Sequence, residues 1–121
     1  PLLPISQEGM IFCDGVPVFD EKTDLILNQE QGRAVAAKLG DHHVLFLRNH
    51  GIVTCGQNVE QAVVLAVTLE RACRTQLLAE AAGGPRLVGH RENNKKVKAS
   101  NMKPGGFINI FNYLARKNGA R

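Results

Sequence analysis

The chain has 121 residues, of which 44% are hydrophobic and 21% charged, and its formal net charge is +4. This length and composition describe a single globular domain and exclude a generally disordered chain. No apolar stretch approaches the ~20 residues that a membrane helix needs. The three cysteines form no CxxC pair, so the sequence argues against a disulfide scaffold and favours a reducing, cytoplasmic compartment.

The charge is distributed unevenly along the chain. Residues 1–85 carry a net charge of −4, whereas residues 86–121 carry +8 and contain a single acidic residue, Glu92. We therefore divide the chain into residues 1–85 and a basic C-terminal segment, residues 86–121. That segment has three possible explanations: contact with nucleic acid or an anionic membrane surface, docking on an acidic neighbouring subunit, or a solvated surface. The lysines at 95–98 have no interleaved aromatic residues, which argues against nucleic acid.

The first predicted elements are two short strands. Met10–Cys13 and Val16–Phe19 are apolar runs separated by Asp14-Gly15, a dipeptide that suits a two-residue hairpin turn. Pro17 cannot donate to a strand ladder, so the second strand should lie at an edge or begin there.

A capped helix and a second hairpin are predicted next. Asn28 followed by Gln31 is a capping-box pattern, and Gly40 is a typical residue after the end of a helix. Val44–Leu47 and Ile52–Cys55 are apolar runs typical of buried strands, and the second is rich in β-branched residues. The four residues between the two runs suit a hairpin loop.

A long helix should follow, from Val59 to about Ala82. Asn58 with Gln61 repeats the capping pattern, and Gly83-Gly84-Pro85 ends the helix. The run Ala62–Val67 is apolar almost all round, which predicts burial on more than one face.

Residues 86–121 contain one further predicted helix. Apolar residues recur at helical spacing between 107 and 114, so a short final helix to about Lys117 is expected.

The histidines are the first candidates for chemistry. His42 and His43 are adjacent, so on a strand they would point to opposite faces and could not share one metal ion. His90 has no partner nearby in sequence. His50 lies in the tight loop between two apolar strands, where an imidazole can project from a rigid base, and Gly51 would let the backbone bend beside it.

Other catalytic patterns are missing from the sequence. The chain contains no GxSxG nucleophile elbow and no glycine-rich phosphate loop. Cys55 and Cys73 are interpreted as buried small hydrophobic residues rather than reactive thiols.

The stretch from Leu47 to Gly56, which reads LRNHGIVTCG, resembles the class II aldolase/adducin family when taken with the helix Val59–Ala82. Pro4-Ile5-Ser6 and the run Leu69–Cys73 also look like this family, and the resemblance extends from Pro4 to Pro85. It implies an α/β fold, a three-layer α/β/α sandwich around a mainly antiparallel sheet. The family's domain is longer, so this chain looks like its C-terminal part.

The resemblance also implies a function. Active members bind a divalent metal, usually zinc, through three histidines, and the histidine of the Asn-His-Gly signature corresponds to His50. The other two ligands come from an earlier HxH motif and the catalytic carboxylate from earlier still, and neither is found in this sequence. The implied activity is that of a lyase of aldolase, epimerase, dehydratase or decarboxylase type. It acts on a small hydroxy-carbonyl or sugar-phosphate-like substrate through a metal-stabilised enediolate.

The C-terminal segment has implied roles too. In several members a tyrosine near the C-terminus assists proton transfer in a neighbouring subunit's site, and Tyr113 is the only tyrosine here. Members are often symmetric tetramers. We therefore expect a homo-oligomer whose segment from about Arg86 crosses to a neighbour, where four apolar side chains would be buried, namely Phe107, Ile108, Ile110 and Phe111.

One alternative stays open. Adducin keeps the fold of this family but is a non-catalytic cytoskeletal scaffold, and the run from Ala72 to Pro85 looks at least as close to that branch. A basic segment also suits a binding role. An HxH motif preceded by a glutamate in the residues before Pro1 would favour the lyase, and its absence would favour the scaffold.

Overall fold

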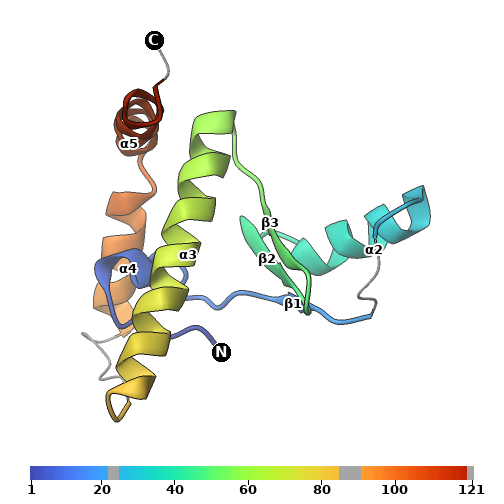
Figure 1. Ribbon diagram of the computed structural model, residues 1–121, viewed down its shortest axis with the longest axis horizontal. Helices are drawn as coiled ribbons and strands as arrows, with labels where there is room; N and C mark the ends of the chain where they lie inside the picture. The colour runs from blue at the N-terminus through green and yellow to red at the C-terminus, as the bar shows by residue number, and fades with distance from the viewer. Residues whose placement is uncertain (22–24, 85–90, 120–121) are drawn as a thin grey trace.

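The computed structural model describes residues 1–21, 25–84 and 91–119. Figure 1 shows a small sheet between α2 on one side and the long α3 on the other. Helix α5 packs on α3, on the side away from the sheet, and α4 packs against α1. The elements in chain order are α1 (Gln7–Met10), β1 (Val18–Phe19), α2 (Gln29–Leu39), β2 (Val44–Leu47), β3 (Gly51–Thr54), α3 (Val59–Ala81), α4 (Arg91–Asn101) and α5 (Pro104–Lys117).

The sheet has the order β1-β2-β3 and is mixed. Strand β1 pairs in parallel with β2, with Val18 opposite Phe46, and the chain between them passes through α2. Strands β2 and β3 form the predicted antiparallel hairpin, with Val44 opposite Thr54. In the part of the chain that the structure describes, the fold is therefore mixed α/β, with one parallel and one antiparallel strand pair.

The first predicted hairpin is wrong. Residues 10–13 are not a strand, because Ser6 caps a short helix by accepting a hydrogen bond from the Gly9 backbone N–H at 3.0 Å. The Asp14-Gly15 turn exists, with Gly15 at a φ of 92°, but it leads from this helical turn toward β1. The carbonyl of Pro17 accepts from the Phe46 N–H at 2.9 Å, so the segment pairs with β2 instead.

The two predicted caps are confirmed. The Asn28 side chain accepts from the Gln31 N–H, and the Gln31 side chain accepts from the Asn28 N–H, which completes a capping box for α2. At the start of α3, Asn58 accepts from the Gln61 N–H at 2.9 Å, but the Gln61 side chain accepts from the Gln57 N–H, so the reciprocal half of the predicted capping box does not form. Both caps use a side-chain oxygen to satisfy backbone donors that have no partner inside the helix.

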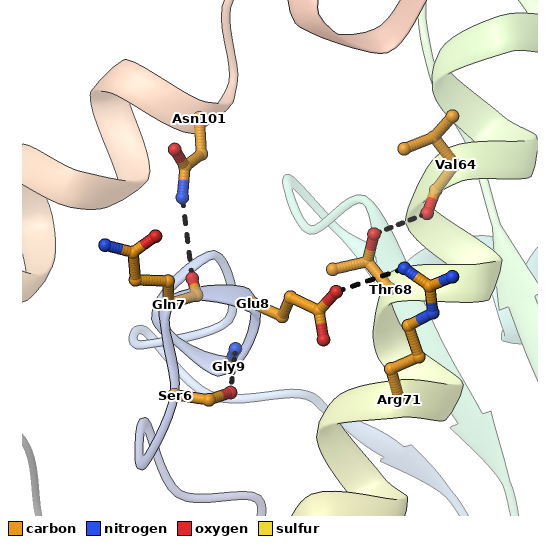
Figure 2. A network of polar contacts seen from close by, with 8 residues as sticks. All are labelled: Ser6, Gln7, Glu8, Gly9, Val64, Thr68, Arg71 and Asn101. Carbon is orange, nitrogen blue, oxygen red and sulfur yellow. Dashed lines mark hydrogen bonds and ion pairs between the residues drawn. The ribbon is translucent and has the colours of Figure 1, made fainter. Parts of the chain in front are cut away.

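Helix α1 is tied to two elements that are far away in sequence (Figure 2). Glu8 forms an ion pair with Arg71 of α3 at 3.3 Å, and Asn101 of α4 donates to the Gln7 carbonyl at 3.5 Å. Close to the Glu8 contact, the buried Thr68 hydroxyl donates to the carbonyl of Val64 within α3. These contacts place α1 between α3 and α4.

The core lies between α1, the first half of α3 and the start of β2. Helix α3 contacts α1, α5 and β3, so the predicted burial on more than one face is confirmed, although Val63 stays exposed. Among the described residues, no helix combines the length and apolar character that crossing a bilayer requires. The buried cluster consists of Ile11, Phe12, Val44, Val64, Leu65, Leu69, Ala72 and Phe107.

The C-terminal segment packs on its own chain. Phe107 of α5 is buried in the core and Phe111 is half-buried against it, whereas Ile108 and Ile110 are exposed. Lys98 of α4 forms an ion pair with Asp14 at 2.6 Å. The expectation that all four apolar side chains are buried on a neighbour is therefore wrong for Phe107, because α3 of the same chain covers it. The predicted boundary at residues 85–86 lies outside the described residues.

Candidate functional site

The tip of the β2–β3 hairpin is a three-residue turn, Arg48–His50. The His50 N–H donates to the Leu47 carbonyl at 3.1 Å, and Asn49 takes the left-handed conformation with φ of 56°. Asparagine tolerates this conformation better than most residues. Gly51 already belongs to β3, has no positive φ, and has open space where a Cβ would stand. The bend therefore depends on Asn49, and the role predicted for Gly51 is wrong.

Arg48 fastens this turn to the neighbouring strand. Its backbone N–H donates to the Phe19 carbonyl at 3.0 Å, and its guanidinium lies 3.3 Å from a carboxylate oxygen of Asp20. Both side chains are about half exposed, so the ion pair itself stabilises by only about 0–1 kcal/mol. Sequence reasoning missed this contact, because the two residues meet only through the register of β1 on β2.

His50 itself is exposed at this turn, as the loop position predicted. Neutral imidazole is the commonest metal-ligating side chain in proteins, so the position suits a ligand. In residues 1–21, 25–84 and 91–119, no group of three or more His, Cys, Asp or Glu side chains could hold a metal ion. The described chain therefore does not form a complete metal site at His50 by itself.

The other described histidines lie at the opposite end of the hairpin. His42 and His43 precede β2 and line a cleft of about 230 Å³ together with Asp14 and Lys98. Cys55 is joined to them, since its N–H donates to the His43 carbonyl at 2.8 Å. His90 lies outside the described residues. The histidines of the described chain thus do not converge on His50.

Cys55 and Cys73 have different surroundings. Cys55 is exposed, so the prediction that it is buried is wrong. The reason is its position directly after β3, which is the edge strand of the described sheet. Cys73 is half-buried on α3, and burial, with a smaller contribution from the Glu70 charge, raises the pKa of its thiol. A raised pKa keeps Cys73 protonated at neutral pH and disfavours a nucleophilic role.

Tyr113 lies on α5, and 54% of its surface is exposed. Figure 1 shows α5 beside the end of α3 where that helix begins, whereas the β2–β3 turn lies at the far end of the hairpin. Pro104 and Phe107 of α5 line a cleft with Asn58, which agrees with this placement. The structure therefore does not bring Tyr113 and His50 together within one chain.

Comparison with known proteins identifies the family of this chain. The family model described as "Class II Aldolase and Adducin N-terminal domain" matches residues 1–77. The chain is 40% identical over 83 residues to 4-hydroxy-3-prenylphenylpyruvate oxygenase/4-hydroxy-3-prenylbenzoate synthase of Streptomyces roseochromogenus, covering 69% of this chain and 30% of that protein. It is 39% identical over 84 residues to decarboxylase NovR of Streptomyces niveus, covering 69% and 31%.

Other relatives extend over more of the chain. Rat alpha-adducin is 35% identical over 107 residues, covering 86% of this chain and 14% of the adducin. An aldolase II superfamily protein from Pseudomonas syringae, known by crystal structure, matches with a TM-score of 0.76 and 32% identity, covering 98% of this chain and 50% of that one. The chain spans about a third of the length of the two Streptomyces relatives and half of the Pseudomonas protein. The chain belongs to the class II aldolase and adducin family.

Proposed function

We propose that this chain is the C-terminal part of a metal-dependent lyase domain that cleaves a bond beside a carbonyl group of a small hydroxy-carbonyl or sugar-phosphate-like substrate. The observation that carries the proposal is the exposed imidazole of His50 on a turn held by Asn49 and by the Arg48–Asp20 pair. Family membership and the similarity to a decarboxylase support it. The complete domain is proposed to be a three-layer α/β/α sandwich with a mainly antiparallel sheet.

His50 would hold a divalent metal, zinc by preference, as one of several ligands. The turn fixes the His50 backbone, and coordination of the metal would fix the orientation of its exposed imidazole. When bound, the metal supplies a Lewis acid that polarises the substrate carbonyl and stabilises developing negative charge. Arg48 stands beside His50 and is held by Asp20, so its role is to keep the turn on the end of β1.

Tyr113 is proposed as a proton-transfer residue in a neighbouring subunit. Its side chain is exposed, and it lies away from the His50 of its own chain. A homo-oligomer, a tetramer by preference, would supply a second chain to place it against. The exposed side chains of Ile108 and Ile110 on the same helix support an interface there.

The metal proposal is tested by His50→Ala in the full-length protein. The variant should lose most of its bound zinc in elemental analysis, whereas His42→Ala should keep it, because His42 lies at the other end of the hairpin. The 121-residue chain alone should bind zinc only weakly in calorimetric titration, since it offers one ligand. Unchanged zinc in His50→Ala, or a tight stoichiometric site in the chain alone, would contradict the assignment.

The assembly proposal is best tested by point substitution, because removing residues 86–121 would also remove Phe107 from the core. Ile110→Asp should lower the molar mass measured by light scattering, since it places a charge in the proposed α5 interface. Leu78→Asp, at an exposed position on α3, is the control and should leave the mass unchanged. Equal masses for the wild-type protein and Ile110→Asp would show that α5 does not hold the assembly together.

The second candidate function is an adducin-like scaffold without catalysis. It is favoured by the similarity to alpha-adducin, which covers 86% of the chain, and by the basic character of residues 86–121. Zinc content separates the two candidates, because a scaffold needs no metal. A full-length protein that carries no zinc and shows no lyase activity would favour the scaffold.

A further inference from the structure

The cleft between the start of α3 and α5 has a volume of about 280 Å³. Its lining comes from the loop that leads into α3, from the residue before β2, and from the start of α5 with the residue at 102. It lies at the end of the β2–β3 hairpin away from His50 (Figure 1). The four extended residues of β3 between them span about 13 Å. A molecule in this cleft therefore does not contact His50 of the same chain.

The polar lining of this cleft consists of amides and one imidazole. The residues are His43, Gln57, Asn58 and Gln61, and among the described residues no Asp, Glu, Lys or Arg lines it. Amides carry both a donor and an acceptor, so the chemistry of the cleft depends on which end of each amide is already used.

The helix cap of α3 decides this for two of the amides. The Asn58 Oδ1 accepts from the Gln61 N–H at 2.9 Å, and the Gln61 Oε1 accepts from the Gln57 N–H at 2.8 Å. A backbone N–H can only donate, so the oxygens must face these bonds and the two NH₂ groups are left over. In residues 1–21, 25–84 and 91–119, neither NH₂ group has a hydrogen-bond partner. A molecule in the cleft thus meets two unpaired donors.

Gln61 is fixed in place. It is only 7% exposed, and a Cβ at Gly56 would stand 2.8 Å from its Cβ, so the two residues pack closely. Folded proteins normally supply an acceptor to a donor that is this deeply buried. Because Gln61 lines the cleft, the acceptor for its Nε2 must come from the molecule that occupies it, water included.

The surroundings favour an acceptor with negative charge. The cleft lies at the first turn of α3, a helix of 23 residues, where the helix dipole is positive. Glu60 belongs to this turn but does not line the cleft. The opposite wall comes from the basic segment, residues 86–121, which carries a net charge of +8. An anion is therefore attracted to this end of α3.

The rest of the lining is apolar and selects among anions. Met102, Pro104 and the buried Phe107 form this part, and an adjoining hollow of about 230 Å³ shares Met102 and His43. An apolar surface with a few converging polar groups is typical of small-molecule sites. Two neutral NH₂ donors match the two oxygens of a carboxylate, whereas a doubly charged phosphate would find no Lys or Arg in the described lining.

We propose that this cleft binds a small carboxylate that carries an apolar group. The Gln61 Nε2 and the Asn58 Nδ2 donate to the carboxylate oxygens, His43 adds a contact through its imidazole, and the apolar group lies against Met102 and Phe107. The proposal concerns a site apart from His50, so it does not rest on metal binding or on lyase activity.

Calorimetric titration of the full-length protein tests the binding. Phenylacetate and hexanoate join a carboxylate to an aromatic and to an aliphatic group, and at least one of them should bind once per chain. Phenylacetamide, acetate and phenyl phosphate lack the charge, lack the apolar group or carry a second charge, and each should bind at least about tenfold more weakly. Absence of binding by both carboxylates, or phenyl phosphate binding as tightly, would overturn the proposal.

Gln61→Glu is the variant that isolates the NH₂ donor. Its carboxylate can still accept from the Gln57 N–H, and glutamate is favourable at the third position of a helix, so the unfolding midpoint should not fall. The affinity for the carboxylate should fall at least about tenfold, because a donor is replaced by a negative charge. Gln31→Glu is the matched control. It makes the same change at the third position of α2, away from the cleft, and should leave the affinity unchanged.

Two further variants make the result decisive. Asn58→Asp keeps an N-cap acceptor but also loses its NH₂ group, so it repeats the test if Gln61→Glu does not fold. His50→Ala should bind the carboxylate as tightly as the wild-type protein, and loss of binding there would assign the ligand to the proposed metal position instead. Equal affinities of Gln61→Glu and Gln31→Glu would show that the carboxylate binds elsewhere. Zinc content and turnover play no part in these titrations, so the metal assignment and this proposal fail separately.

Discussion

The two halves of α3 are built from similar residues but lie in different surroundings. In the first half, Val64, Leu65 and Leu69 are buried against α1, β2 and α5. In the second half, Leu77 and Leu78 are both exposed. The helix continues without interruption through both halves, so helix formation and burial are separate outcomes. The local sequence is sufficient to form the helix. Which part of the helix is buried depends on the elements that pack against it, here α1, β2 and α5.

The largest expected difference in the free energy of unfolding is between alanine substitutions of a leucine in each half of α3. Leu65→Ala should lower the free energy of unfolding by about 2–5 kcal/mol, because it leaves a cavity in a fully buried site. Leu77→Ala in the chain alone should change it by less than about 0.5 kcal/mol, because the side chain is exposed. Urea unfolding measures both, and similar losses would show that the two halves of α3 are packed equally well.

Two glycines extend the comparison between packed and open regions, with smaller expected changes in the free energy of unfolding. A Cβ at Gly56 would stand 2.8 Å from the Cβ of Gln61, at the start of the packed half, so Gly56→Ala should cost about 1–3 kcal/mol. Gly51, beside His50, has open space around it, so Gly51→Ala should be neutral or stabilise by up to about 1 kcal/mol. Thermal unfolding of the two variants decides this, and a large loss in Gly51→Ala would reveal a contact that the described chain lacks.

The smallest expected effect concerns the ion pair that fastens α4 to the packed region. The hydrogen bond from Lys98, with smaller contributions from the charges of Lys98, Lys95 and Arg91, lowers the pKa of Asp14 below its usual value of 3.8. A lowered pKa in the folded state means that the stabilisation is fully present above about pH 4 and is lost as the pH falls through the folded value. Both side chains are partly exposed, so the effect should be small and should weaken with salt.

This pH dependence is measured by urea unfolding at a series of acid pH values. Asp14→Asn and Lys98→Met should both lose stability less steeply below about pH 4 than the wild-type chain. If all three slopes were the same, the ion pair would not contribute to folding.

Local signals predicted the two capped helices and the β2–β3 hairpin. Asn28 and Asn58 each act on a backbone donor three residues away, so the information lies within one turn of chain. The strand predicted for Met10–Cys13 was wrong because four apolar residues suit a strand or a helical turn equally well. Burial of Ile11 and Phe12 is compatible with both structures. Ser6 was the signal that could have separated the two, since it caps the helical turn.

Other features depended on contacts that no local pattern contains. Helix α4 has few apolar residues, and its polar side chains Asn94 and Lys98 face other parts of the chain instead. In the candidate site, the exposed position of His50 followed from the Asn-His-Gly stretch and the two flanking strands. The sequence did not predict that Arg48 and Asp20 attach this turn to β1. These two residues are 28 positions apart and meet only when β1 pairs with β2.

The ties between the first residues and the late helices have a consequence for the order of folding. Leu3 meets Gln76, Asp14 meets Lys98 and Gln7 meets Asn101, across 73, 84 and 94 positions of the chain. Contacts that close such long loops form late, because the chain entropy lost must be offset before they stabilise anything. During synthesis, Ile11 and Phe12 therefore precede their core partners on α3 and α5, and they stay uncovered until α3 has left the ribosome. In that interval the growing chain exposes apolar side chains that belong to its core, and a chaperone or rapid synthesis of α3 would protect them.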